Sequence, residues 1–489
     1  MILTVHRPCE GGRALGPGRP PGRTAAALLL LVLLWLAAAP AARGQPPGAF
    51  SAAFDAALAN DAEYRASRFE LQGREQAVPI ARAGLLPNLA ASYFESRLRG
   101  EREQLNALGQ EFTQRLDYRN PSTALQFRTP LVNFEALRRY EASQAQVDGA
   151  RARFAARGQE LLDRLGTAYV QRLFGEELVA LARAQVEAFR VQSDAAARRF
   201  GGGEGTRTDV AEAAAALALA RAQLIEAMDA RDVSQRTLAR ITGLASPPLR
   251  GLAEDTRPLP MPYDDVDDWV ETGVARNPNV QSRRHLLEEA QIEVQRNQAS
   301  HLPRLDLVAN AINSQSESVS TLNQQVRQYS VGIQLNIPIF SGGIIEARVE
   351  QAVAEASRVE AQLEADRLAL AVDIRRQRQF TQTGLAKIEA YKDAIAASLV
   401  ALEGNQRGLV AGVRTTVDVN EATRRLFLSR RDFAQARYEV LLARLRLQTL
   451  AGLPLADIVQ DIDRHLTAPP AGMPVTAQDA TARPEAQPR

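Results

Sequence analysis

An internal duplication restricts the fold of this 489-residue chain more than any other feature. Repeated segments at a constant spacing indicate repeated structural units. Two motifs recur 209 positions later in the chain: Thr208-Asp209-Val210 as Val417-Asp418-Val419, and Ile241-Thr242-Gly243 as Leu450-Ala451-Gly452. We therefore predict two structural repeats, residues 43–245 and 266–455, joined by a proline-rich linker over 246–265.

Each half contains two segments with the two-residue period of a β-strand. In the second half, the odd positions over 305–311 and 329–337 are apolar and alternate with mainly polar residues. Such alternation is typical of a transmembrane barrel wall with lipid outside and water inside, although a soluble, half-buried hairpin shows it too. We predict strand hairpins at about 87–131 and 303–339, with an exposed loop over the polar stretch 97–120.

One helix is predicted before each strand hairpin and two long helices after it, over 135–243 and 343–452. The first helix of each pair spans about 65 residues without proline, which make a helix of roughly 100 Å. Short glycine-containing turns join the helices of each pair. Apolar residues recur every seven positions at Val419, Leu426, Phe433, Val440 and Leu447. A strict heptad requires supercoiling against neighbouring helices, and an ordinary extended coiled coil is the alternative.

Residues 1–42 have the features of an export signal. Arginines precede the apolar run at 25–36, and small residues with an A-x-A cleavage site follow it. The run is shorter than the about 20 residues that a membrane-spanning helix needs. No longer apolar stretch follows, so we expect the mature chain to be exported and, if it crosses a bilayer, to cross it as a β-barrel.

Composition argues against most catalytic and metal-dependent functions. The one cysteine, Cys9, lies in the predicted signal peptide, and the four histidines lack the spacing of metal ligands. The formal charge of +2 gives no field suited to nucleic acid. We expect no enzyme activity, no cofactor, no metal and no nucleic-acid partner. The proline-rich tail, placed at 456–489, is expected to be disordered.

Four strands cannot close a barrel, and the open edges of a sheet cannot face lipid. The chain must therefore form an oligomer if its strands enter a membrane. Two copies supply eight strands, whose side chains fill the interior, whereas three copies supply twelve strands around a water-filled lumen. We expect a homotrimer with its threefold axis along the tube.

The sequence resembles the TolC family of outer-membrane efflux and secretion ducts over about residues 48–455. The resemblance is most specific in the segment GVRTTVDVNEAT at 412–423, which continues through Ala436-Arg437-Tyr438. The proline-containing strand ends Thr129-Pro130 and Ile337-Pro338 are also similar to the family pattern. The resemblance implies a mixed fold: a homotrimer with a twelve-stranded transmembrane β-barrel, four strands per chain, continued by a long α-helical coiled-coil barrel.

The resemblance also implies a function and a location. It implies the exit duct of a tripartite export system, for type I secretion or multidrug efflux, in the outer membrane of a Gram-negative bacterium. The implied partners are outer-membrane lipid, a periplasmic adaptor and an inner-membrane transporter of the ABC or RND type. A periplasmic adaptor with helical hairpins is the alternative, although it needs a lipoyl-like β module that the sequence does not show.

Some functional positions of the family carry over residue by residue. Asp418 and Glu421 match acidic positions around the periplasmic tunnel entrance, where Glu421 replaces the more familiar Asp. Thr208, Asp209 and Arg414 match positions that link the helical hairpins in the closed state. The resemblance further implies contact with the adaptor at the hairpin tips, through Gly203, Gly205, Gly412 and Val413.

One position departs from the family pattern. Leu409 stands where the family's best-known pattern has Tyr, so one closing hydrogen bond is expected to be absent. Closure then depends on threefold repetition of exposed contacts worth roughly 0.2 to 1 kcal/mol each.

Overall fold

The computed structural model describes residues 48–105, 109–252, 260–318 and 321–467. They belong to one unit, Gly48–Arg489. The predicted signal peptide and residues 253–259 of the predicted linker lie outside the described residues. The order of elements is short helices, a strand hairpin and a long helical hairpin, and this order then recurs.

Several short helices occupy each place where the sequence predicts one. In the first half these are α2 (Ala49–Asn60), α3 (Ala62–Glu75) and α4 (Ala77–Ala83), and in the second half α7 (Val266–Arg276) and α8 (Pro278–Ala299). Asp61 separates α2 from α3, because its backbone is extended and its carboxylate accepts the Tyr64 backbone N–H at 2.8 Å. This is the geometry of a helix N-cap.

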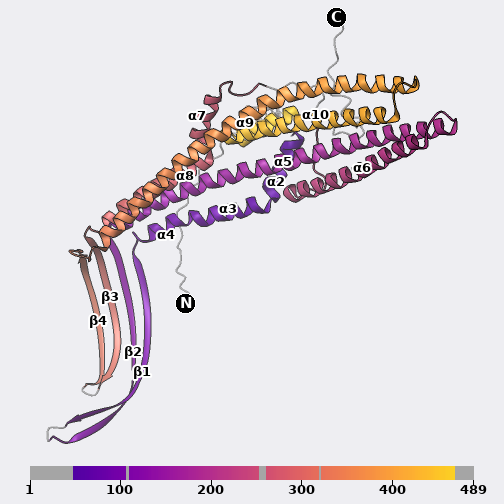
Figure 1. Cartoon of the computed structure of the whole chain (residues 1–489). Helices are drawn as coiled ribbons and strands as arrows, with labels where there is room; N and C mark the ends of the chain where they lie inside the picture. Colours follow the sequence, from indigo (N-terminus) through magenta and orange to yellow (C-terminus); the bar gives the residue numbers. More distant parts are fainter. Residues whose placement is uncertain (1–47, 106–108, 253–259, 319–320, 468–489) are drawn as a thin grey trace, which may run out of the picture. The chain divides into compact units, whose positions relative to one another are not determined.

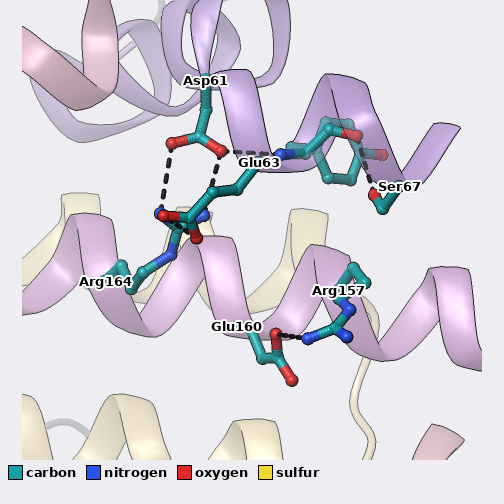
Figure 2. Close-up of polar contacts among 7 residues, drawn as sticks. Asp61, Glu63, Ser67, Arg157, Glu160 and Arg164 are labelled. Carbon is teal, nitrogen blue, oxygen red and sulfur yellow. Dashed lines mark hydrogen bonds and ion pairs between the residues drawn. The ribbon is translucent and has the colours of Figure 1, made fainter. Parts of the chain in front are cut away.

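Ion pairs attach α3 to the first long helix, α5 (Phe134–Gly201) (Figure 2). Arg164 of α5 contacts Asp61 at 2.9 Å and Glu63 at 2.8 Å. The Asp61 side chain is nearly buried, whereas Glu63 remains exposed. The Asp61 carboxylate therefore both begins α3 and holds it against α5.

The four strands form one antiparallel sheet in the order β1-β2-β3-β4 (Figure 1). Their bounds are β1 Asn88–Leu105, β2 Glu111–Val132, β3 Arg304–Ser318 and β4 Thr321–Asn336.

The prediction of a loop over 97–120 is wrong, because β1 and β2 both continue into it. Ion pairs between the two strands accompany the continuation: Arg97 with Asp117 at 2.7 Å, and Arg115 with Glu101 at 3.4 Å. Opposite charges across a strand pair stabilise it. This stabilisation does not depend on apolar alternation, the signal used to predict the strands.

One face of the sheet is apolar and uncovered in the single chain. On β4, Tyr329, Val331, Ile333 and Leu335 expose 82, 78, 67 and 57 % of their surface. The predicted alternation is therefore present on β4. No other part of the described chain covers these apolar residues. None of the helices in the described residues combines the length and apolar content needed to span a membrane.

Two long helical hairpins contain most of the remaining residues: α5 with α6 (Arg207–Thr242), and α9 (Ile344–Val410) with α10 (Thr416–Leu450). The helices of each hairpin pack against each other. With 68 residues in α5 and 67 in α9, each of these helices is about 100 Å long at roughly 1.5 Å per residue. Three of the predicted heptad positions on α10 are buried: Val419, Leu426 and Leu447.

The largest core lies where α2, α5, α6, α10 and α11 (Leu455–His465) meet. Phe50 of α2 packs edge to face on Tyr169 of α5, with ring centroids 5.3 Å apart. Other members of this core are Leu161, Leu165, Leu238, Leu445 and Ile458. A second cluster surrounds Trp269 and includes Ile374 and Leu447.

The prediction of a disordered tail from residue 456 is wrong for its first ten residues, which belong to α11. Ile458, Val459 and Ile462 are apolar at helical spacing and are buried in the core. Asp463 accepts the backbone N–H of Phe50 at 2.8 Å, at the start of α2. Apolar burial and this contact order the segment despite the proline-rich sequence that follows.

Candidate functional site at the helical hairpin tips

Each long hairpin reverses in a short turn that uses glycine where the backbone requires it. In the first tip, Gly203 has φ +83° between the end of α5 and the start of α6. In the second, Gly412 has φ +76° between α9 and α10. Residues with a Cβ rarely adopt this conformation. Gly205 lies close to the backbone of Arg199 and Phe200, in the same first turn.

A capping box follows each turn. In the first, the Thr206 hydroxyl accepts the Asp209 backbone N–H at 3.1 Å, and the Asp209 carboxylate accepts the Thr206 backbone N–H at 3.1 Å. In the second, Thr415 and Asp418 make the same reciprocal bonds at 3.2 and 2.9 Å. Each box satisfies two otherwise free backbone donors and fixes the start of its helix.

Hydrogen bonds within the boxes hold both carboxylates in their charged form. The Thr206 hydroxyl and backbone lower the pKa of Asp209, and the Thr415 backbone and hydroxyl lower the pKa of Asp418. Hydrogen bonds to a charged carboxylate favour that form over the protonated one. Both side chains therefore carry a negative charge at neutral pH.

Asp209 also lies near the other hairpin. Its largest interactions are with Thr206, and the Thr416 side chain makes a smaller contribution that lowers the pKa of Asp209. Thr416 is the first residue of α10 and is 4 % exposed. The Asp209 carboxylate is thus close to the beginning of α10 as well as to that of α6, although the two helix starts are far apart in the sequence.

The other two predicted gate links have different surroundings. Arg414 lies against Gly408 in its own turn, and its charge contributes to the low pKa of Asp418. Thr208 is exposed in the first turn of α6. Within the single described chain, Asp209 therefore reaches the second hairpin through Thr416, whereas Arg414 stays beside its own hairpin's acid.

The two predicted aperture acids lie on the first turns of α10, three residues apart. The Asp418 carboxylate points back to the N-cap, where Thr415 binds it. The exposed Glu421 forms an ion pair with Arg424 at 2.9 Å. Arg424 was not singled out from the sequence, although its spacing of three residues from Glu421 is a detectable helical signal.

A second contact between the hairpins lies deeper along α10. The Gln192 side chain of α5 donates a hydrogen bond to the Thr423 hydroxyl at 2.8 Å, and Thr423 is 1 % exposed. Neither this contact nor that of Thr416 was predicted, because each joins residues from separate halves of the chain without a local sequence pattern.

The outermost part of the second tip is apolar and exposed. Val410 and Val413 expose 91 and 77 % of their surface, one on each side of Gly412. Among the described residues, no group of three His, Cys, Asp or Glu side chains is arranged to hold a metal ion.

Comparisons with known proteins give the family. The model of the outer membrane efflux protein family matches residues 53–244 and 269–453. The alkaline protease secretion protein AprF of Pseudomonas aeruginosa is 34 % identical over 414 residues, which cover 84 % of this chain and 85 % of AprF. The proteases secretion protein PrtF of Dickeya chrysanthemi is 34 % identical over 433 residues, covering 87 % of this chain and 92 % of PrtF.

A solved structure shows the same fold. CusC superimposes with a TM-score of 0.71 at 16 % identity, over 83 % of this chain and 92 % of the CusC chain. These matches give no support to the adaptor alternative, and the matched family is one of transport channels rather than enzymes. The chain therefore belongs to the outer membrane efflux protein family and is an outer-membrane exit duct of a secretion or efflux system.

Proposed function

We propose that three copies of this chain assemble into the duct, each copy supplying four strands of a twelve-stranded barrel. The proposal rests on the two open edges and the exposed apolar face of the four-stranded sheet. Within the described strands, β1 and β4 each have one paired edge, and the apolar face between them is uncovered. Lipid does not tolerate unpaired backbone groups, so neighbouring chains must pair with these two edges.

The height of the apolar band supports insertion in a membrane. From Tyr329 to Ile337 the outward residues of β4 and its continuation are apolar, and Arg327 lies immediately beyond Tyr329. Eight steps at about 3.4 Å each span roughly 27 Å along the strand, which is a height of about 20 Å for a strand tilted by roughly 40°. Outer-membrane barrels carry an apolar band of about 25 Å with aromatic residues at its borders. Tyr329 lies at one such border.

The long helices continue the duct as a coiled-coil tunnel. Support comes from their length of about 100 Å, from the buried heptad positions of α10 and from the packing within each hairpin. The two halves of the chain have the same order of elements and matching capping boxes. We attribute this correspondence to duplication of an ancestral half.

The cargo we propose is protein, exported by type I secretion. Support comes from AprF and PrtF, both named as protease secretion proteins and both 34 % identical to this chain. The efflux protein BepC of Brucella suis is 27 % identical. Type I secretion requires a periplasmic adaptor and an inner-membrane transporter, here of the ABC type. Gly203, Gly205, Gly412 and Val413 form the surface that contacts the adaptor.

The hairpin tips form the gate. Three copies of Asp418 and Glu421 surround a narrow aqueous opening with six carboxylates, which attract cations. Asp209, with Thr208 and Arg414, holds the hairpins together in the closed state. The exposed contacts are individually weak, so docking of the adaptor can release them.

Planar bilayer recording tests the proposed duct. The purified trimer is expected to conduct ions weakly as wild type, because the tips are closed, and strongly after Arg414→Ala. If the wild type and the Arg414→Ala and Asp209→Ala variants all insert but conduct no ions, the duct is contradicted. Equal conductance of wild type and both variants contradicts the gate alone.

A further inference from the structure

At the end of the sheet nearest the helices, the polar face carries a compact group of charges. Asp306 of β3 contacts Arg128 of β2 at 2.6 Å and Arg304 of β3 at 3.0 Å. We refer to Arg128, Arg304 and Asp306 as the Arg-Asp-Arg cluster. It lies at the end of the sheet that joins the helices, because β2 continues into α5 shortly after Arg128 and β3 follows α8 at Arg304.

The strand register places the cluster on the face opposite the apolar band. Arg304 pairs with Asn336 and Asp306 with Gln334, so all these side chains share one face. Arg128 pairs with Val308 on the same face. The apolar residues Leu305 and Leu335 pair with each other on the opposite face. In a barrel whose apolar side contacts lipid, the cluster therefore faces the lumen.

The rest of this polar face carries no charge within four ranges of the strands, and Arg102, which shares the face, lies outside them toward the far end of β1. Its residues over 88–100, 118–130, 304–314 and 324–336 are otherwise amides, hydroxyls, glycine, proline and apolar side chains. The three charges are therefore concentrated in one row of the wall. No nearby acid on this face, within those ranges, offsets the two arginines apart from Asp306.

The two guanidinium groups of the cluster are exposed to solvent, whereas its carboxylate is buried. The Asp306 side chain is 2 % exposed, whereas Arg128 exposes 50 % and Arg304 41 % of their side chains. The two guanidinium groups cover the carboxylate. Each chain thus contributes a net charge of +1 to this row, and the two guanidinium groups have more donors than Asp306 can accept.

We propose that three Arg-Asp-Arg clusters form a positively charged ring inside the barrel, which favours the passage of anions and of carboxylate or phosphate groups on the cargo. The inference rests on the proposed trimeric duct. Three copies give a net charge of +3 in one cross-section of a lumen bounded by low-dielectric walls, where the field of such a ring is concentrated. Arginine is well suited to the task, because its planar fork binds carboxylates and phosphates with two hydrogen bonds.

The ring opposes the sign of the proposed gate. Asp418 and Glu421 attract cations at the helical tips, whereas the cluster attracts anions at the barrel end of the helices. The two rings lie about 100 Å apart along α9. This distance is far beyond the screening length of about 10 Å at 0.1 M salt. Each ring therefore acts on permeating ions independently of the other.

A purely structural role is the alternative. The pairing of β2 with β3 shifts register between Pro130 and Val132, and Asp306 pairs with Pro130 beside this bulge. Arg128 and Arg304 could serve only to hold the strands together there. Such a role predicts changes in trimer stability without a change in ion selectivity, and the two readouts separate the alternatives.

Reversal potentials in a KCl gradient test the ring. R128Q and R304Q each lower the net charge of the cluster from +1 to 0 while leaving Asp306 one arginine partner. R119Q is the matched control, because it removes the same charge from an odd position of β2, on the opposite face. All variants are measured as detergent-extracted trimers in an Asp418→Asn, Glu421→Gln background, so that the acidic tip does not dominate.

The ring predicts that the chloride-to-potassium permeability ratio falls at least about twofold in both R128Q and R304Q and stays constant in R119Q. Trimers of R128Q and R304Q that conduct with the parental reversal potential overturn the ring. If one variant fails to assemble, the other decides the outcome. A parental protein that inserts but does not conduct even after Arg414→Ala and Asp209→Ala overturns the proposed duct, a result distinct from failure of the ring.

Discussion

The Asp209 carboxylate at the start of α6 is held in its charged form by Thr206 of its own capping box and by Thr416 of the other hairpin. One acid therefore fixes a helix terminus and lies beside the start of the other hairpin's second helix. Thr416 is buried and Asp209 only partly so.

Asp209→Ala is predicted to open the duct. The substitution removes the contact with Thr416 and half of a capping box in every chain, and three such losses act on one opening. We expect single-channel conductance in planar bilayers to rise several-fold. Glu204→Ala is the control, because Glu204 is an exposed acid in the same turn. Equal increases in both variants contradict a specific role for Asp209.

Arg424→Gln is predicted to strengthen block by divalent cations. Arg424 forms an exposed ion pair with Glu421 at 2.9 Å in the described chain, so its removal leaves three more carboxylates unpaired and makes the opening more negative. Asp418→Ala combined with Glu421→Ala should weaken the same block. Titration of Mg²⁺ or Ca²⁺ during conductance recording measures both effects. Unchanged block in every variant shows that these acids do not line the opening.

Ile458→Ala is predicted to destabilise the protein by about 2 to 5 kcal/mol, because it leaves a cavity in a close-packed core. Ile458 is 1 % exposed and packs with residues from α2, α5 and α10. Thermal dissociation of the trimer, followed by gel mobility, measures the loss. Gln460→Ala on the exposed side of α11 should have little effect. Equal behaviour of the two variants contradicts a structural role for α11.

The pairing of Arg444 with Asp461 predicts a dependence on acid pH. Burial raises the pKa of Asp461, but hydrogen bonding and the charge of Arg444, at 2.6 Å, outweigh it and lower the pKa below the ordinary 3.8. The resulting stabilisation is complete well above pH 3.8 and is lost as the pH falls below that value toward the depressed pKa.

Hydrogen exchange of α11 over pH 3 to 6 measures this effect. The wild type should lose protection in α11 at the acid end of the range. Asp461→Asn should lower protection at neutral pH and remove the dependence. If α11 in the wild type exchanges at the same intrinsic-rate-corrected level throughout, the ion pair does not anchor it.

The elements with a strong periodic pattern could be predicted from the sequence. Apolar residues recur every seven positions around Val419 and every two positions around Val331. The first period is typical of a helix and the second of a strand. The extension of β1 past Arg97 was missed, because charged pairs and not apolar residues accompany it. Helix α11 was missed, because a proline-rich sequence follows its short apolar face.

The candidate site could be predicted as positions but not as contacts. Asp209 and Asp418 were identified because the segments around them resemble the family pattern. The partner of Asp209, Thr416, lies more than two hundred residues away. The Arg-Asp-Arg cluster also joins strands from different halves of the chain. Such pairs follow from the strand order and helix packing, which no local pattern specifies.

Cysteine cross-linking between the two edge strands tests the trimeric barrel most directly. The sequence has a single cysteine, Cys9, and it lies within the predicted signal peptide, so any disulfide in the mature protein must come from introduced residues. Ala91→Cys on β1 is combined in turn with Tyr329→Cys, Val331→Cys, Ile333→Cys or Leu335→Cys on β4. Four partners on β4 are tested because the register between neighbouring chains determines which of them lies opposite Ala91.

Oxidation in outer-membrane fractions, followed by non-reducing denaturing gels, gives the result. The proposed barrel predicts that at least one pair yields covalent dimers and trimers and no larger species, because a closed ring of three has only three β1–β4 junctions. Single-cysteine controls should yield no trimers. Monomers alone in every pair, or a ladder that continues beyond trimers, contradicts the account.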